Sequence, residues 1–547
     1  MSWNVGERMP ELEAWMHARR WYRGEPHPLY LRARADLACG TDVACGADVA
    51  CSVEPFTLTW FIIEAGAALY NVPLLLAPAE GGPAEAGPRG NGATYGCGTP
   101  DGSGTPDRND DAAPAAQSPT DATPVARARG HLIFDATTHP AGQRFLFAAA
   151  TGQLGSSPTA SAPAADSPAG SNASTRPGAN SPTAASALHL VTRPASFPGS
   201  YRSARPLSGE QSNSSIIYQT STVPLIIKLF RVLSPGANPD VELQAALSDT
   251  GTVPAQWGSA ALVGGPAEAG SDVLVAQEFL TGAHDAWRVV TSSFPAADKN
   301  AANAPGPDTP PAAVDVPAPN CPPTADVPAP DQAAALLGDF AARIRDLGTL
   351  TRTFHTALAT RLGTTAATPQ LREAQLASWH SRARAALAAV PELEQRSAQI
   401  AQVFAAAAAT PWPALQRIHG DYHLGQVVDV PGRGWMALDF EGEPLRPLPE
   451  RVAPDLALRD VAGMLRSFDY AGGQGERDGQ PAARMRAWTR AAEGAFLAGY
   501  GAIPAEHQPL LRALLLDKAL YEVVYEVNQR PDWIDLPLGG VHRLLEN

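Results

Sequence analysis

The residues best suited to carry out chemistry lie in one polar, glycine-punctuated stretch, 417–444, with the sequence RIHGDYHLGQVVDVPGRGWMALDFEGEP. Asp421 and Asp439 are separated by two short apolar runs around the turn PGRG, so a hairpin there would bring both acids close together. Gln426 follows Asp421 five residues later. Phosphoryl transfer needs one carboxylate to orient the acceptor hydroxyl, and a second carboxylate with an amide oxygen to hold Mg²⁺. The alternative, a polar turn with solvated acids, fits an isolated HGD better than this full set.

A phosphotransferase that uses a nucleotide also needs a lysine for the phosphates, placed on a strand upstream. Lys228 interrupts the apolar run VPLIIKLF, where an isolated charge is costly and should have a carboxylate partner. Glu242 is the candidate partner, because it follows the helix start formed by Asn238 and Pro239. The alternative is that Lys228 reaches solvent from an edge strand and that Glu242 is solvated.

A serine-rich segment, SGEQSNSS at 208–215, lies between two extended stretches. It contains no GxGxxG pattern, which argues against a Rossmann dinucleotide site. Backbone N–H groups and hydroxyls of this turn could instead cover phosphates, although such turns are common. The candidates are Ser212, Ser214 and Ser215.

Composition limits the classes of function. The chain has 547 residues and a net charge of −14, so it should hold two to four folding units and has no broad basic surface for nucleic acid. The chain contains no run of about 18 apolar residues, so we expect no membrane span. The first residues lack the apolar region of a secretory signal. We therefore expect a cytoplasmic protein without a nucleic-acid or membrane partner.

Several segments are dominated by Gly, Pro, Ala, Ser, Thr and Asp. Because they have few large apolar side chains, they cannot bury enough surface to offset the entropy of ordering. We expect low-complexity inserts at 36–51, 78–128, 152–187 and 296–332. The predicted organisation is an N-terminal subdomain over 1–205, a small strand–helix unit over 206–285 and a helical part over 286–547.

Between these inserts, the apolar pattern predicts strands first and helices afterwards. The runs at 56–76 predict one or two hairpins, and 215–232 predicts two strands joined by a polar turn. GHLIFDA at 130–136 is a further short strand, followed by the apolar run RFLFAA at 144–149. Apolar residues at helical spacing predict helices at 332–361, 370–409, 454–470, 481–500 and 506–530.

The motifs EQSNSS, LIIKLFR, GANPDVEL, HGDYHLGQ, LDFEGEP and LRDVAGMLRSFDYA together resemble the aminoglycoside phosphotransferase and choline kinase-like family, and within it the maltokinases. The resemblance implies an α+β, bilobal protein-kinase-like fold with an N-terminal cap subdomain and a mostly helical C-terminal lobe. It also implies ATP- and Mg²⁺-dependent transfer of the γ-phosphoryl group to the anomeric hydroxyl of maltose, giving maltose 1-phosphate and ADP for α-glucan and glycogen synthesis. A separate trehalose synthase chain would be a partner.

For the reacting groups, the resemblance implies that Asp421 is the catalytic base and that Lys228 binds the phosphates, oriented by Glu242. It implies magnesium ligands at Gln426, Asp439 and Glu441.

For the two substrates, the resemblance places adenine against the segment at Gln277 and Phe279. His419 would brace the loop that carries the base. Candidate sugar contacts are His423, Arg459, Asp460, Tyr521 and Tyr525.

Two other functions stay open. A glucosamine kinase or another amino-sugar kinase of related architecture would want extra carboxylates around its amine-bearing acceptor. A catalytically inert kinase-like module would bind partners through its inserts, but such modules usually lose the base or the metal-binding acid, and both acids are present here together with Lys228.

Overall fold

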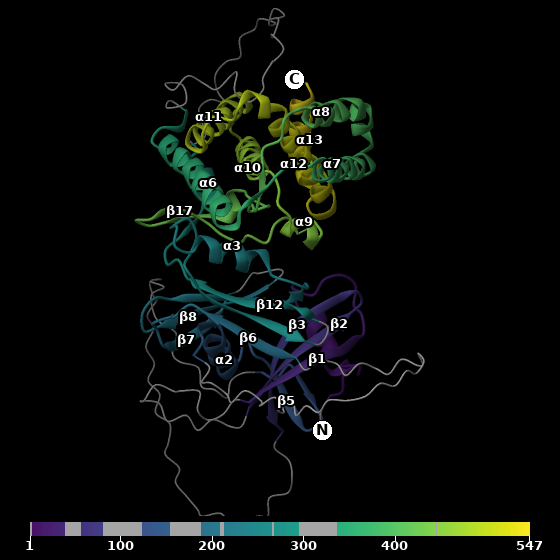
Figure 1. Cartoon of the computed structure of the whole chain (residues 1–547), viewed down its shortest axis with the longest axis vertical. Coiled ribbons are helices and arrows are strands. Elements are labelled where there is room, and N and C mark those ends of the chain that lie inside the picture. Colours follow the sequence, from purple (N-terminus) through teal and green to yellow (C-terminus); the bar gives the residue numbers. More distant parts are fainter. Residues whose placement is uncertain are drawn as a thin grey trace, which may run out of the picture. The chain divides into compact units, whose positions relative to one another are not determined.

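The structure is a computed structural model, drawn in Figure 1, in which the helices and strands are labelled. It describes residues 3–38, 56–79, 123–153, 188–207, 213–264, 267–294, 336–444 and 446–546. Most residues of the four predicted inserts lie outside the described part of the chain. The insert predicted at 78–128 is too long at its C-terminal end, because residues 126–128 form a strand that pairs with residues 131–133. None of the helices in the described part of the chain is long and apolar enough to cross a membrane.

The chain folds as two compact units. The N-terminal unit consists of residues 1–235 and 258–276, and the C-terminal unit of residues 236–257 and 277–547. The predicted separation of 1–205 from 206–285 stays a prediction.

The first sheet of the N-terminal unit is antiparallel, with the order β1-β2-β3-β5-β4, and β10 pairs with β3. The predicted hairpin at 56–76 is confirmed, since Thr57 pairs with Leu76 across a turn that contains Gly66 at a φ of +61°. Leu12 and Met16 of α1 are buried with the apolar side chains of this sheet. The elements are α1 (Pro10–His17), β1 (Leu29–Ala38), β2 (Thr57–Ala65), β3 (Ala68–Pro78), β4 (Ala126–Ala128), β5 (His131–Asp135) and β10 (Val232–Leu233).

The second sheet has the order β6-β11-β12-β9-β8-β7, and α2 lies beside it (Figure 1). The apolar run at 144–149 belongs to α2, which begins at Pro140 with the side chain of His139 accepting a hydrogen bond from the backbone of Ala141. The two strands predicted over 215–232 are confirmed as β8 and β9. The elements are α2 (Pro140–Thr151), β6 (His189–Pro194), β7 (Tyr201–Pro206), β8 (Asn213–Thr220), β9 (Leu225–Phe230), β11 (Gln256–Gly264) and β12 (Ala267–Glu278).

The C-terminal unit is mostly helical, as the apolar spacing predicts. The stretch predicted as helix over 370–409 is two helices, because Pro391 ends the first and begins a short 3₁₀ turn. The α-helices in the described part of this unit are α3 (Pro239–Leu247), α4 (Ala286–Ser292), α6 (Phe340–Leu362), α7 (Pro369–Ala389), α8 (Ser397–Ala409), α9 (Leu448–Val452), α10 (Leu458–Arg477), α11 (Ala482–Tyr500), α12 (Gln508–Gln529) and α13 (Asp535–Leu545). The 3₁₀ turns are η2 (Pro391–Arg396), η3 (Leu424–Gln426), η4 (Ala505–His507) and η5 (Pro531–Trp533).

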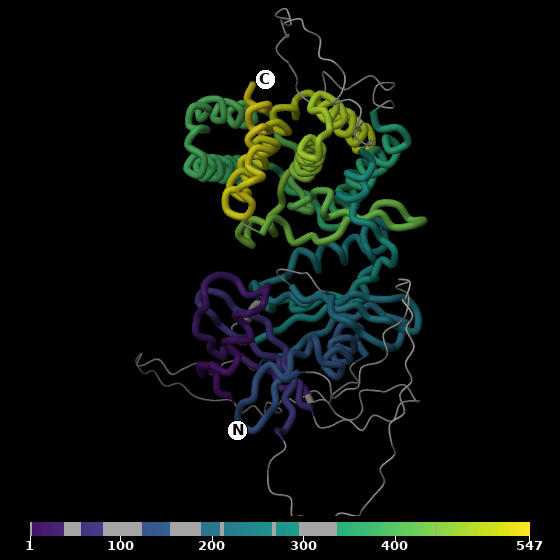
Figure 2. The backbone as a smooth tube through the Cα atoms, turned by 180° about the vertical axis from the view of Figure 1, so that it is seen from behind, coloured from purple at the N-terminus to yellow at the C-terminus, as the bar shows by residue number. Residues whose placement is uncertain are grey.

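Close helix packing builds the core of this unit. Helix α6 crosses α11 where Gly348 and Gly499 face the partner backbone, and a Cβ atom at either glycine would lie 2.0 Å or less from a carbonyl oxygen. Helix α12 lies against α7, α8 and α10, and Figure 2 shows α7 and α8 side by side next to it. These contacts fix α10 and α12, the two helices that support the candidate site.

Short strands carry the polar stretch that the sequence singles out. The hairpin predicted around PGRG is confirmed as β16 and β17, with Val427 paired to Ala437 and Val430 paired to Gly434. The strands of this unit are β13 (His284–Asp285), β14 (Thr364–Thr365), β15 (Leu415–Gln416), β16 (Val427–Val430) and β17 (Gly434–Ala437).

Candidate active site

Two loops flank the β16–β17 hairpin, and we name them the HGD loop (residues 417–426) and the DFEG loop (residues 438–444). The backbone N–H of Leu438 donates to the carbonyl of Gln426 at 2.9 Å, which closes the base of the hairpin. Gly420 and Gly442 have φ values of +83° and +76°, and a Cβ atom on Gly420 would lie 3.3 Å from the Cα atom of Gly442. Both glycines therefore allow the two loops to approach closely.

Asp421 is held by a cation from α12. Lys518 donates to Oδ1 of Asp421 at 3.0 Å, and Nε2 of His423 lies 3.9 Å from Oδ2. Burial by itself raises the pKa of Asp421, but the interactions with Lys518 and His423 outweigh burial and lower the pKa to about 2. Asp421 is therefore an ionised carboxylate at neutral pH, as a group that orients a hydroxyl and accepts its proton must be.

Asp460 of α10, predicted as a sugar contact, is instead buried beneath the HGD loop. Its Oδ2 accepts the backbone N–H of His419 at 2.8 Å, and its Oδ1 accepts that of Gly420 at 2.9 Å. Nε2 of His355 lies 2.9 Å from Oδ2, and only 1% of Asp460 is exposed. Both carboxylate oxygens are bound to groups inside the protein, which argues against the predicted sugar contact. His419 braces the loop as predicted, with Nε2 at 2.8 Å from the carbonyl of Leu438.

Arg459, also predicted as a sugar contact, belongs to a buried ion-pair network. Its Nε atom lies 2.7 Å from Asp455, four residues earlier in the chain, and Nη1 lies 2.9 Å from Asp517 of α12. Since these contacts occupy the guanidinium inside the core, they argue against the predicted sugar contact of Arg459 as well.

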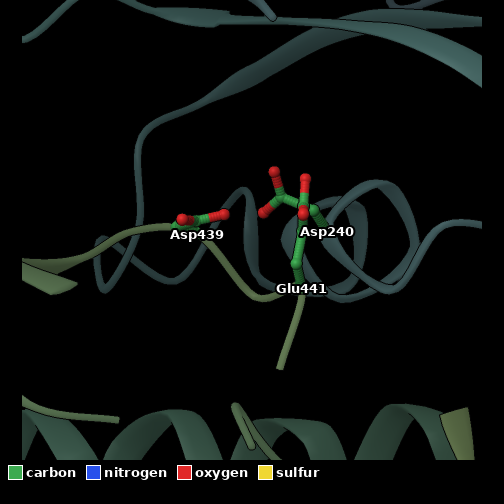
Figure 3. Close-up of side chains that lie close together, drawn as sticks. All are labelled: Asp240, Asp439 and Glu441. Carbon is green, nitrogen blue, oxygen red and sulfur yellow. The ribbon is translucent and has the colours of Figure 1, made fainter. Parts of the chain in front are cut away.

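Three carboxylates converge in the C-terminal unit, as Figure 3 shows. Asp240 from α3 and two acids of the DFEG loop, Asp439 and Glu441, each place one oxygen within 4.8 Å of the others. Asp439 has a φ of +60°, a value that is uncommon for a residue with a side chain and is concentrated at functional sites. Nε2 of Gln426 lies 3.5 Å from Oδ2 of Asp439, so this amide also faces the cluster. Hard oxygen donors of this kind suit Mg²⁺, and the residues fit the ion expected from the sequence.

Asp240 is a functional candidate that the sequence analysis missed. It lies in the first turn of α3, where an acid is expected simply because the helix begins there, and its backbone N–H donates to the cap Asn238 at 2.8 Å. In the structure Oδ1 of Asp240 accepts the backbone N–H of Phe440 at 2.8 Å, and the side chain is buried. Asp240 therefore ties α3 to the DFEG loop.

Glu242, the predicted partner of Lys228, has a different partner within its own unit. The guanidinium of Arg417 donates to Oε2 of Glu242 at 2.6 Å. Lys228 belongs to the N-terminal unit, so the proposed Lys–Glu pair stays a prediction.

The phosphate-binding candidates of the N-terminal unit lie on adjacent strands. Lys228 in β9 is paired with Ser215 in β8, and its Nζ atom lies 5.6 Å from the centre of the Phe230 ring. Ser214 also lies in β8, where its hydroxyl accepts Nε of the buried Arg231 at 2.8 Å. Ser214 and Ser215 are therefore strand residues rather than part of a turn, and their contact with phosphates stays a prediction. Ser212 lies outside the described residues.

Gln277 and Phe279, the predicted adenine contacts, lie at the end of β12 and just after it. Gln277 is buried, with 8% of its surface exposed, and among the described residues its Nε2 has no hydrogen-bond partner. A buried amide without a partner is costly, so a ligand acceptor at this point would relieve that cost.

Of the remaining sugar-contact candidates, His423 lies next to Asp421 and Tyr521 lies next to Lys518. His423 accepts the backbone N–H of Gly425 through Nδ1 at 3.0 Å, and burial lowers the pKa of its imidazole despite the nearby Asp421. The ring of Tyr521 lies 4.9 Å from Nζ of Lys518. Tyr525, one turn further along α12, has its ring 5.7 Å from the guanidinium of Arg530. Their contact with a sugar stays a prediction.

Lys518 and Glu443 are further members of the site that the sequence analysis did not identify. Lys518 donates to Oε1 of Glu443 at 2.7 Å as well as to Asp421. Lys518 is 97 residues from Asp421 in sequence, so no local pattern indicates the contact. The signal for Glu443 is the second acid of FEGEP, which lies two residues after Glu441.

Comparisons with known proteins show which solved structures share this fold. Three solved structures of glucosamine kinase match almost the whole chain, and the one in complex with glucosamine, ADP and inorganic phosphate has a TM-score of 0.57, 20% identity and 97% of each chain covered. Crystal form B of glucosamine kinase has a TM-score of 0.58 at the same identity and coverage. The chain has the kinase-like fold. The α+β class predicted from the sequence is thereby confirmed.

Sequence relatives carry the same name. Glucosamine kinase from Streptacidiphilus jiangxiensis is 35% identical over 210 residues, which are 35% of this chain and 46% of the relative. Glucosamine kinase from Mycolicibacterium smegmatis is 32% identical over 136 residues, 23% of this chain and 34% of the relative. The matches thus span less than half of the length of these curated relatives. No protein-family model matches the chain.

Proposed function

We propose that this protein is a sugar kinase that transfers the γ-phosphoryl group of ATP to a sugar hydroxyl. The observation that carries the proposal is the placement of Asp421 and Asp439 on two loops held together at the base of one hairpin, with Glu441 and Asp240 close to Asp439. Phosphoryl transfer requires an orienting carboxylate beside a group of metal-binding acids, and the C-terminal unit supplies both kinds of group.

In this proposal Asp421 orients the acceptor hydroxyl through Oδ2 and receives its proton, while Oδ1 stays bound to Lys518. Mg²⁺ would be held by Asp439 and Glu441, with Asp240 and the amide of Gln426 nearby, and when bound it neutralises charge on the phosphate oxygens. An amide ligand must present its oxygen, so the side chain of Gln426 would turn over relative to Asp439.

For the nucleotide, we propose that Lys228 neutralises the α- and β-phosphates and that the unpaired amide of Gln277 donates to adenine. Ser214 and Ser215 are the described members of the serine segment that would lie near the phosphates.

We propose glucosamine as the acceptor. Two curated relatives that match part of the chain, and three solved structures that match almost all of it, are glucosamine kinases. The charges around Asp421 agree with an acceptor that carries an amine, because Glu443 and Glu522 add two carboxylates, while the cations that pair with this group are Lys518 and Arg466. Excess negative charge favours a cationic sugar over a neutral one.

Maltose is the second candidate acceptor. It rests on the motifs that resemble maltokinases, and its product would be maltose 1-phosphate. A separate trehalose synthase chain as partner follows only from this second candidate.

The deciding experiment is ³¹P NMR of the products formed from MgATP with glucosamine, maltose or glucose, because phosphorus–proton coupling identifies the phosphorylated hydroxyl. We expect a sugar phosphate from glucosamine. Asp421→Asn serves as the matched control, and its kcat should be about 10²–10⁴-fold lower. If maltose is the only one of the three sugars that is phosphorylated, maltose replaces glucosamine as the proposed acceptor. Absence of any sugar phosphate, with equal ATP consumption by both proteins, would refute the sugar kinase.

A further inference from the structure

Lys518 is a buried cation shared between the two loops of the site. From α12 its ammonium donates to Oδ1 of Asp421 at 3.0 Å and to Oε1 of Glu443 at 2.7 Å. The exposed fraction of the three side chains is 14% for Lys518, 17% for Asp421 and 4% for Glu443. One lysine therefore links the HGD loop, the DFEG loop and α12 at a place with little access to water.

The two oxygens of the Asp421 carboxylate have different surroundings. Oδ1 is occupied by the ammonium, whereas Oδ2 accepts no hydrogen bond from the described residues, and Nε2 of His423 lies 3.9 Å from it. A carboxylate with one oxygen fixed can rotate little about its terminal bond. The free oxygen is therefore held in one direction, as a group that must meet a hydroxyl requires.

We propose that Lys518 is a positioning residue for phosphoryl transfer, which aims Oδ2 of Asp421 at the acceptor hydroxyl and fixes the spacing between the HGD and DFEG loops through Glu443. This inference rests on the proposed function and extends it to a residue outside the motifs. Lys518 acts through Asp421 and does not itself react.

The charges around the lysine support this assignment. Burial lowers the pKa of Lys518, but Asp421, Glu443 and Glu522 outweigh burial and raise the pKa well above its ordinary value. The ammonium is therefore charged at neutral pH. His419 and His423 are the other titratable groups whose charges act on Asp421.

A purely structural role would make a different prediction. In that case Lys518 would only neutralise the buried carboxylate of Glu443, because an uncompensated charge in the interior is strongly destabilising. Removing both charges together would then restore a normal enzyme. The two roles are separated by the variants Lys518→Met and Glu443→Gln, alone and combined, in the full-length protein.

The experiment measures kcat, KM for MgATP and KM for the sugar, together with the melting temperature of each variant. We expect Lys518→Met to lower kcat about 10²-fold, because misplacement by about 1 Å is enough for such a loss. KM for MgATP should change less than about twofold, because Lys518 is assigned no contact with the nucleotide. The double variant with Glu443→Gln should recover the melting temperature while kcat stays low. Recovery of kcat in the double variant would overturn the proposal.

A second set of variants tests whether Lys518 acts through Asp421. In the background of Asp421→Asn, the further change Lys518→Met should lower kcat less than about twofold, since residues that act as a unit are not additive. Loss of another factor of about 10² would overturn the proposal. Arg512→Met is the matched control, because it removes a cation from the same helix that donates to the carbonyl of Leu544 at 2.6 Å and does not contact Asp421.

A readout without activity separates this inference from the proposed function. If the wild-type protein phosphorylates no sugar, the proposed function fails, and crystal structures of wild-type and Lys518→Met protein still test the contact. A changed orientation of the Asp421 carboxylate in the variant supports its positioning by Lys518, and an unchanged orientation overturns it.

Discussion

Replacing Asp460 with Asn tests how the HGD loop is held in place. The side chain of Asp460 accepts two backbone N–H groups, from His419 and Gly420, and contacts the imidazole of His355. An asparagine has the same shape, but it presents one NH₂ group where the aspartate presents an oxygen. One backbone N–H of the loop would then face a donor and stay unpaired inside the protein.

The expected cost follows from these contacts. A hydrogen bond to a charged group contributes about 1.5–3 kcal/mol, and a buried donor left without a partner costs about 1–3 kcal/mol. We therefore expect Asp460→Asn to lower the free energy of unfolding by about 3 kcal/mol. Because the loop carries Asp421, kcat should fall about 10²-fold, while KM for the sugar stays within about threefold.

Urea denaturation gives the free energy of unfolding by linear extrapolation, and steady-state assays give kcat and KM. Asp346→Asn on the exposed face of α6 is the matched control and should change stability by less than about 0.5 kcal/mol. Gly463→Ala offers an independent test, because its Cβ would lie 2.5 Å from the carbonyl of Tyr422 and push α10 away from the loop. Normal stability of Asp460→Asn together with a raised KM for the sugar would refute the role of Asp460 in holding the HGD loop. The result would instead favour a contact between Asp460 and the sugar.

Three further predictions concern the site. Asp439→Asn should abolish the Mg²⁺-dependent part of ADP binding measured by calorimetry, whereas Asp346→Asn should not, and equal Mg²⁺ dependence in both would contradict the metal assignment. The pKa of Asp421 is lowered to about 2, so the contribution of its ionised carboxylate to the free energy of unfolding is present above about pH 4 and is lost as the pH falls towards 2. The difference in the free energy of unfolding between the wild-type protein and Asp421→Asn measures this contribution, and its complete loss already at pH 5 would contradict the sign. Gln277→Met should raise the melting temperature without ligand and raise KM for ATP, because it removes a buried unpaired amide; a lower melting temperature would contradict it.

The elements of the site could be predicted because their signals are local. The hairpin β16–β17 follows from alternating apolar residues around PGRG, and the start of α3 follows from Asn238 and Pro239. The one apolar run whose element was not specified, 144–149, is helical because Pro140 and the cap at His139 precede it. Short apolar runs fit a strand or a helix equally well, and the residues before them decide.

The partners of charged residues could not be predicted in the same way. Glu242 and Asp240 both lie in the first turn of α3, and the sequence does not indicate that Glu242 binds Arg417 while Asp240 reaches the backbone of Phe440. The choice depends on which face of a short helix meets the DFEG loop, and this is set by packing over long sequence distances. Lys518 was missed for the same reason, since a single lysine on an apolar helix has no local signature.

The two aspartates of the site differ because their surroundings differ, and this difference assigns their chemistry. Asp421 shares its carboxylate with an ammonium, which keeps it ionised and leaves one oxygen for a hydroxyl. Asp439 lies among other carboxylates, Asp240 and Glu441, where crowded negative charge favours a divalent cation. Exchanging the two environments would leave the base crowded by acids and the metal ligand blocked by a lysine. If the proposed function holds, Lys518 and Asp240, neither of which belongs to the HGD or DFEG motif, determine which aspartate does which task.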